Sequence, residues 1–308
     1  MPISAAQVEF ADPSAACPCR SSKLGRECCL DERGRIRGVP AAVPVPRLGP
    51  ADSATLRCYA APIGGCSPQL SGEHYLSHAV LRRMTSNGVG QLQVSRMAWL
   101  PPEKSLIIPP SQLKAKILCT AHNAALSPYD SVGDRFCEML LKIGEPAGET
   151  RTVTGLFNGE DLERWFLKTL CGVTAMEAEV RRTQWCAPKP WLEALFKLNE
   201  AMPSGAGLWL NLGGFWIFPD GAPSMSATPI DDPHGGDPAG LRLHFCGMEF
   251  VFLTSHGHRR WVPNGRLRPG LLSFQTPGYC GVHIGISYRY SPLGLYLKGQ
   301  GTPAPRNA

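Results

Sequence analysis

Residues 119–134 of this chain read CTAHNAALSPYDSVGD. The stretch opens with a cysteine and a histidine, Cys119 and His122, at the spacing of a zinc knuckle. Its Ser-Pro-Tyr-Asp segment predicts that a helix starts at Ser127, because serine is a favoured N-cap and proline fits the first helical position. We expect the helix to continue to Ile143, before a glycine and a proline stop it.

Two upstream cysteines, Cys58 and Cys66, can complete the ligand set that Cys119 and His122 begin. The chain has 12 cysteines and starts without the basic and apolar segments of an export signal. Cytosolic thiols stay reduced, so clustered cysteines favour metal ligation over a disulfide framework. We therefore predict that these four side chains close on one structural zinc ion.

A second group of four thiols lies near the N-terminus, as Cys17-Pro-Cys19 and Cys28-Cys29. Four thiolates around zinc would let this short segment fold without a core of its own, whereas the alternative is four unligated reduced thiols. The spacing resembles the SEC-C zinc motif, although Arg20 stands where that motif usually has glycine. The resemblance implies an attachment module for a protein or nucleic-acid partner.

An acid and a histidine, Glu73 and His74, follow Cys66 closely, and Asn123 directly follows His122. An acid–histidine pair followed by a zinc knuckle that ends in asparagine resembles the HNH, or ββα-metal, nuclease motif. The resemblance covers roughly residues 56–140. It implies a zinc-stapled ββα domain that hydrolyses phosphodiester bonds in nucleic acid with the help of a divalent cation.

Carried over by position, the HNH resemblance makes His74 the general base and Glu73 a ligand of the catalytic Mg²⁺ or Mn²⁺. Asn123 would orient His74. Asp130 takes the third position, where the motif has histidine or asparagine, and its carboxylate suits the same cation. This departure leaves two functions open: a metal-dependent HNH endonuclease, or a non-catalytic zinc adaptor that binds nucleic acid or a protein partner.

Composition and charge agree with a soluble nucleic-acid-binding protein. The chain has 308 residues, is 43% hydrophobic and carries a formal net charge of +6, and it lacks the roughly 20 consecutive apolar residues that span a membrane. We expect a cytoplasmic protein without a membrane partner, and DNA is favoured over RNA as the ligand. Several basic residues could contact a phosphate backbone, and the alternative is that they are isolated surface charges. They are Arg82, Arg83, Arg96, Lys104, Lys114 and Lys116.

The predicted fold class is α+β, with four parts along the chain. They are a SEC-C-like zinc module (1–35), a Pro/Gly-rich extended linker (36–54), an HNH-like domain (55–145) and an α+β domain of unknown role (150–298). The last part reads as helices followed by an antiparallel sheet, with one helix over 159–171 that Gly172 ends and another over 191–201.

Overall fold

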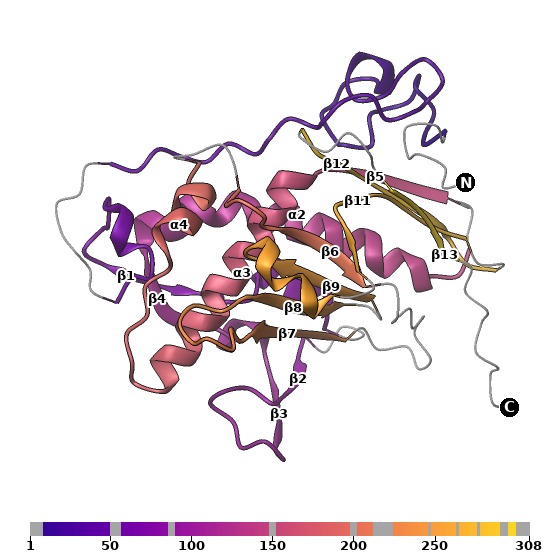
Figure 1. The fold of residues 1–308 in the computed structure, drawn as a ribbon. Coiled ribbons are helices and arrows are strands. Elements are labelled where there is room, and N and C mark those ends of the chain that lie inside the picture. The colour runs from indigo at the N-terminus through magenta and orange to yellow at the C-terminus, as the bar shows by residue number, and fades with distance from the viewer. Residues whose placement is uncertain are drawn as a thin grey trace, which may run out of the picture.

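The computed structural model describes residues 9–49, 57–85, 90–147, 152–197, 202–211, 224–245, 248–262, 265–275, 278–289 and 295–299. They form a mixed α+β fold with two long helices among several sheets, as Figure 1 shows, so the predicted fold class is confirmed at that level. The long helices, α2 (Thr120–Leu141) and α3 (Gly159–Val180), pack against each other.

The region around the predicted knuckle is built from two strands and a helix. Strand β1 (Leu70–Glu73) pairs antiparallel with β4 (Ala115–Cys119), and α2 follows β4 without a break. The intervening chain forms the short helix α1 (His78–Arg83) and a hairpin that projects from the body of the molecule in Figure 1. The hairpin strands are β2 (Leu92–Ser95) and β3 (Ser105–Ile108).

Helix α2 begins seven residues earlier than Ser127, so the start predicted there is wrong. Its N-cap is Cys119, whose sulfur accepts a hydrogen bond from the backbone N–H of His122. Pro128 therefore lies inside the helix, where it lacks the N–H that would reach the carbonyl of Ala124. The hydroxyl of Ser127 donates to that same carbonyl at 2.9 Å, which compensates for the missing bond.

The C-terminal half contains two larger sheets. The five-stranded sheet has the order β10-β6-β9-β8-β7 and is antiparallel throughout, as predicted. The four-stranded sheet, of order β13-β11-β12-β5, departs from the prediction because β5–β12 and β11–β13 are parallel pairs. A long segment separates β5 from β12, so no tight turn forces these strands to run antiparallel. The strand bounds are β5 (Thr152–Asn158), β6 (Gly207–Asn211), β7 (Met225–Ile230), β8 (Gly240–Phe245), β9 (Met248–Leu253), β10 (Gly265–Leu267), β11 (Pro269–Phe274), β12 (Gly281–Ser287) and β13 (Leu295–Gly299).

Helix α3 forms where the apolar periodicity predicts it, but it continues past Gly172 to Val180. A Cβ atom at Gly172 would lie 3.0 Å from the carbonyl oxygen of Tyr75. This glycine therefore allows α3 to pack closely against the chain at Tyr75, and it does not end the helix. The second predicted helix is α4 (Lys189–Leu195), shorter than expected; residues 198–201 of that prediction lie outside the described chain.

Buried side chains on both sides of the boundary predicted at 145–150 belong to one hydrophobic cluster, which extends from Cys58 to Tyr288. The contact between α2 and α3 connects the two parts, and α2 also contacts β5. The segments 55–145 and 150–298 therefore share a core.

The N-terminal cysteine module lies on the four-stranded sheet and is not separate from the rest of the molecule. Its buried residues Phe10 and Leu30 pack against Leu156 of β5 and Leu271 of β11. The backbone N–H of Leu156 donates to the carbonyl of Pro18 at 3.2 Å. The module is thus attached to the sheet by both apolar and backbone contacts.

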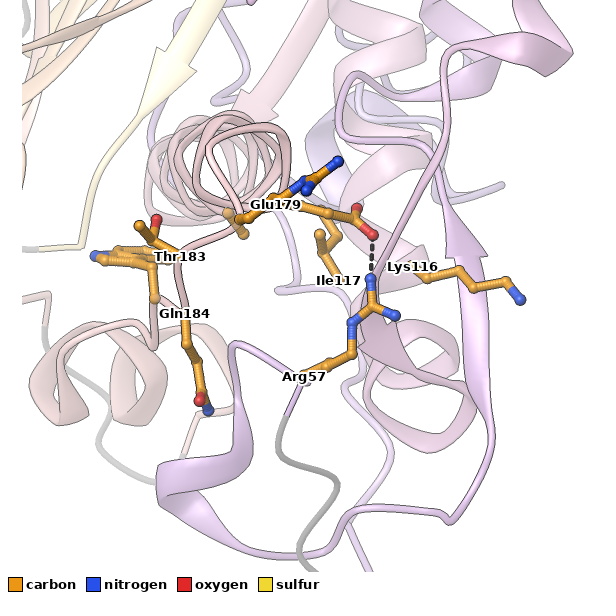
Figure 2. Close-up of a pocket in the computed structure, with 9 residues that line it drawn as sticks. Arg57, Lys116, Ile117, Glu179, Thr183 and Gln184 are labelled. Atoms are coloured by element: carbon orange, nitrogen blue, oxygen red, sulfur yellow. Dashed lines mark hydrogen bonds and ion pairs between the residues drawn. The ribbon is translucent and has the colours of Figure 1, made fainter. Parts of the chain in front are cut away.

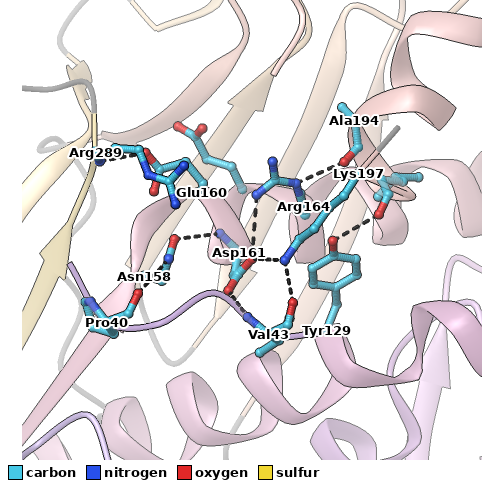
Figure 3. Close-up of polar contacts among 12 residues, drawn as sticks. Pro40, Val43, Tyr129, Asn158, Glu160, Asp161, Arg164, Ala194, Lys197 and Arg289 are labelled. Atoms are coloured by element: carbon cyan, nitrogen blue, oxygen red, sulfur yellow. Dashed lines mark hydrogen bonds and ion pairs between the residues drawn. The ribbon is translucent and has the colours of Figure 1, made fainter. Parts of the chain in front are cut away.

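The described part of the predicted linker, residues 36–49, runs in extended form over the molecule (Figure 1). Figure 3 shows how it is held: Asn158 donates to the carbonyl of Pro40 at 2.9 Å, and the N–H of Val43 donates to Asp161 at 2.7 Å. Lys197 donates to the carbonyl of Val43. Residues 50–54 of the predicted linker lie outside the described chain.

Candidate functional site

The structure brings Cys58, Cys66, Cys119 and His122 together, and we call this group the cysteine–histidine cluster. Nδ1 of His122 lies 3.3 Å from Sγ of Cys58, 3.7 Å from Sγ of Cys66 and 3.2 Å from Sγ of Cys119. All four residues are buried. Cys119 and His122 lie at the junction between β4 and α2, so their spacing along the chain is sufficient to bring these two donors together.

These distances suit a single tetrahedral metal ion. Zinc bonds of about 2.3 Å to sulfur and about 2.0–2.1 Å to nitrogen place neighbouring donors about 3.6–3.8 Å apart. The three sulfur–nitrogen distances of 3.2, 3.3 and 3.7 Å are close to that edge length. The cysteine–histidine cluster could therefore hold a metal ion through Nδ1 of His122, and its donor types are compatible with structural zinc.

Burial and hydrogen bonds together determine the protonation of the cysteine–histidine cluster. Burial lowers the pKa of His122, so its ring is neutral at pH 7, the form that binds a metal. Burial also raises the pKa of Cys58. For Cys119 the same effect is outweighed by hydrogen bonds from His122 and Ser67, and its pKa is lowered. Cys119 therefore forms a thiolate more readily than Cys58.

The second predicted group is also assembled: Cys17, Cys19, Cys28 and Cys29 form a four-cysteine cluster whose sulfurs lie within 4.8 Å of one another. Sγ of Cys28 is 3.6 Å from that of Cys19 and 3.4 Å from that of Cys29. Arg20 has φ of 65° in the loop between the pairs. Glycine adopts this left-handed conformation without the strain that a side chain such as that of Arg20 introduces.

The predicted ligands of the catalytic cation, Glu73 and Asp130, both face the ammonium group of Lys168, which lies on α3. Nζ of Lys168 lies 3.1 Å from Oε1 of Glu73 and 2.6 Å from Oδ2 of Asp130. The side chains of Glu73 and Lys168 are each only 5% exposed. A third contact comes from Ser77, which donates to Asp130 and accepts from Nε1 of Trp165 at 2.9 Å.

We call Lys168, Glu73 and Asp130 the acid–lysine site, in which the ammonium and the carboxylates favour each other's charged forms. Burial lowers the pKa of Lys168, but the carboxylates of Glu73 and Asp130 outweigh it, and the net pKa is raised. Burial raises the pKa of Glu73, and Lys168 opposes that rise. The ammonium thus stays charged at neutral pH and occupies the space between two acids that the HNH resemblance assigns to a divalent cation.

His74 directly follows β1 and lies half-buried beside this site. Its ring stacks on His78, with centroids 4.5 Å apart, and burial lowers its pKa, as does the charge of His78. Nε2 of His74 is buried and has no hydrogen-bond partner among the described residues. Asn123 lies on α2, and no hydrogen bond joins its side chain to His74 in the described chain.

Lys168 is the functional residue that the sequence reasoning missed. The apolar residues that predict this helix, Leu162, Trp165, Phe166 and Leu170, leave Lys168 on the opposite face, which we would expect to be exposed. In the structure the whole segment 161–173 is buried, so Lys168 needs acidic partners, since an unpaired buried charge is too costly. The apolar periodicity carries no signal for this ion pair.

No protein-family model matches this chain, and no similar protein was found among curated proteins or solved structures. In the part of the chain described, no helix is long and apolar enough to cross a membrane.

Proposed function

We propose that this protein is a zinc-stabilised, non-catalytic nucleic-acid-binding protein built on an HNH-like ββα unit. The observation that carries the proposal is the position of Lys168, whose ammonium contacts both Glu73 and Asp130. Those carboxylates are the oxygen ligands that a nuclease of this type would use for its cation.

An ammonium ion at this place opposes the binding of Mg²⁺ or Mn²⁺. The divalent ion would have to separate Lys168 from both acids and leave its charge buried beside the metal, which is unfavourable in a site of low polarity. Mg²⁺ also keeps several water ligands in most protein sites, and the side chain of Glu73 is only 5% exposed. The ion pair supports a folded but inactive copy of the nuclease unit.

Structural zinc is part of this proposal. The cysteine–histidine cluster would fasten the loop around Cys58 and Cys66 to the start of α2, and the four-cysteine cluster would hold the N-terminal module. Buried cysteine sets that surround a single point fit Zn²⁺ better than ions that prefer oxygen ligands. The resemblance to the SEC-C motif supports the N-terminal zinc module as a contact surface for a partner.

Exposed basic side chains around the ββα unit support nucleic acid as the ligand. Lys114 precedes β4 and Lys116 lies on it, and both are exposed, as are Arg82 on α1 and Arg57 beside Cys58. Together with the net charge of +6, they favour a polyanionic ligand.

An active HNH endonuclease is the second candidate. The order β1, β4, α2 and the proximity of Glu73, His74 and Asp130 favour it. In that case a divalent cation would displace Lys168 when the substrate binds, and His74 would activate water.

A combined binding and cleavage assay separates the two functions. Zinc-loaded full-length protein is incubated with supercoiled plasmid and with single-stranded DNA and RNA in the presence of Mg²⁺ or Mn²⁺. We expect retarded complexes that weaken with salt, and no nicked or shortened product. Cleavage that is lost in His74→Ala but kept in His78→Ala, the stacked neighbour, would instead establish the nuclease.

A further inference from the structure

A pocket of about 340 Å³ lies near the cysteine–histidine cluster, apart from the acid–lysine site. Arg57, the residue before Cys58, forms one side, and β4 and the C-terminal end of α3 form the others. Its volume is at the lower end of the range for small-ligand sites, about 300–1,000 Å³. The polar and aromatic residues that line it are Arg57, Lys116, Glu179, Arg182, Thr183, Gln184 and Trp185.

The charge of this pocket favours an anion, because it has three cationic side chains and one carboxylate. Figure 2 shows the guanidinium of Arg57 turned towards Glu179, with which it forms an ion pair, while the side chain of Lys116 extends outward at the rim. Within the described chain, neither Lys116 nor Arg182 forms an ion pair. Two positive charges are therefore left for a ligand.

Arg182 lies in an unusual backbone position for arginine. Helix α3 ends in a Schellman motif, with bonds from Arg182 N to Glu179 O at 3.0 Å and from Thr183 N to Ala178 O at 2.8 Å. Arg182 occupies the left-handed position, with φ of 56°, where glycine is strongly preferred. This conformation is strained for arginine, and strained residues cluster at functional sites. We therefore infer that the cationic side chain of Arg182 makes a functional contact in the pocket.

Trp185 supplies an aromatic wall beside these cations. Its Nε1 donates to Oδ1 of Asp237 at 3.0 Å, and its ring centroid lies 6.3 Å from that of Tyr59 and 6.5 Å from that of Trp191. The ring is half-buried and held from several sides, so it is ordered before a ligand arrives. Aromatic faces next to basic groups are typical of sites that bind single-stranded nucleic acid.

We propose that this pocket binds one nucleotide unit of a nucleic-acid strand, with its phosphate on Arg182 and its base against Trp185. Lys116 at the rim would contact the next phosphate along the strand, while Arg57 stays paired with Glu179. The inference rests on the proposed nucleic-acid-binding function and assigns it to a site apart from the acid–lysine site.

The test measures the affinity of full-length, zinc-loaded protein for a fluorescent single-stranded DNA of about 12 nucleotides, a length within the range covered by such sites. Polarisation is recorded at about 50 and about 200 mM salt. Lys116→Gln and Arg182→Gln should each bind about tenfold more weakly, and each should reduce the salt slope by about 0.7. Glu179→Gln, which removes the one carboxylate, should bind more tightly than the natural protein.

Arg181→Gln is the matched control, because Arg181 is exposed, directly precedes Arg182 and pairs with Glu177 outside the pocket. It should keep the natural affinity within about twofold. If the strand binds but all variants retain the natural affinity, the pocket is not the site and the inference is overturned while the proposed function stands. If the natural protein does not bind any strand at the lower salt concentration, both the pocket inference and the proposed nucleic-acid-binding function are overturned. Unchanged zinc content and circular dichroism confirm that each variant is folded.

Discussion

Lys168 is buried between two acids, Glu73 and Asp130, and forms an ion pair with each. Its side chain is 5% exposed, and its Nζ lies within 3.1 Å of both carboxylates. Because the three charged groups come from β1, α2 and α3, they also join the three elements at one point.

Replacement of Lys168 should destabilise the protein strongly. Lys168→Met leaves Glu73 and Asp130 facing each other without a cation, and removing one partner of a buried pair costs about 3–5 kcal/mol. Urea unfolding followed by tryptophan fluorescence measures the change. Lys114→Met, at an exposed lysine, is the control and should change the free energy of unfolding by less than about 0.5 kcal/mol.

The partners of Lys168 can be tested in the same series. Glu73→Gln and Asp130→Asn, added to Lys168→Met, remove the uncompensated negative charges and should recover part of the lost stability. An unaltered loss in the triple variant would contradict the ion-pair account. So would a Lys168→Met protein as stable as the natural one.

His283 links stability to pH. Burial lowers its pKa from the ordinary value of 6.5, so the folded protein favours the neutral ring. Its contribution to stability is complete above pH 6.5 and is lost as pH falls through the lower folded-state pKa. His283→Gln should therefore lose less free energy of unfolding between about pH 7.5 and about pH 5.5 than the natural protein. Urea unfolding at the two pH values measures the difference.

At the scale of the elements, the contact between α2 and α3 depends on the absence of a side chain at Gly133. A Cβ there would lie 2.2 Å from the ring of Trp165, whose Nε1 donates to Ser77. The two helices therefore pack closely, and the ring is held in one orientation between them.

The substitution Gly133→Ala tests this packing with a clear sign. In a free helix, alanine is more favourable than glycine by about 1 kcal/mol. Here the methyl group would displace Trp165 from a close-packed core, and we expect a net destabilisation of about 1–3 kcal/mol. Urea unfolding measures the effect, and Ser131→Ala, at an exposed position of the same helix, should be close to neutral. An increase in stability for Gly133→Ala would show that the helices are separated.

On the scale of the whole molecule, the two cysteine clusters hold different parts of the chain. The cysteine–histidine cluster belongs to the central hydrophobic cluster, whereas the four-cysteine cluster lies in the N-terminal module on the four-stranded sheet. Loss of one metal should therefore have different consequences from loss of the other.

Elemental analysis of purified protein should find about two zinc ions per chain, and one fewer in each of Cys17→Ser and Cys119→Ser. We expect Cys119→Ser to unfold the core, because it removes a ligand buried between β4 and α2. Cys17→Ser should release the N-terminal module and leave the cooperative unfolding of the remainder in place, as limited proteolysis would show. A protein without zinc, or one that stays folded when chelated, would contradict the structural role of both clusters.

Local patterns in the sequence were sufficient for several features. Cys17, Cys19, Cys28 and Cys29 are close in the chain, and Cys119-x-x-His122 has knuckle spacing, so their grouping depends on short segments alone. The presence of α3 likewise follows from the spacing of its apolar residues, although residues 161–173 are buried on all sides and not on one face. Such features depend on neighbours within one or two turns, which is why a single sequence reveals them.

Contacts between distant segments determine the other features, which the sequence did not predict. Pro128 is accommodated inside α2 because Ser127 bonds to Ala124 and because Cys119 caps the helix at an earlier position. The extended segment 36–49 is held by Asp161, and the pairing of Lys168 with Glu73 and Asp130 joins three elements. The apolar periodicity of α3 does not show that Lys168 is buried. Only the tertiary structure decides this and brings Glu73 and Asp130 within its reach, because the burial of the helix on all sides depends on contacts with distant segments.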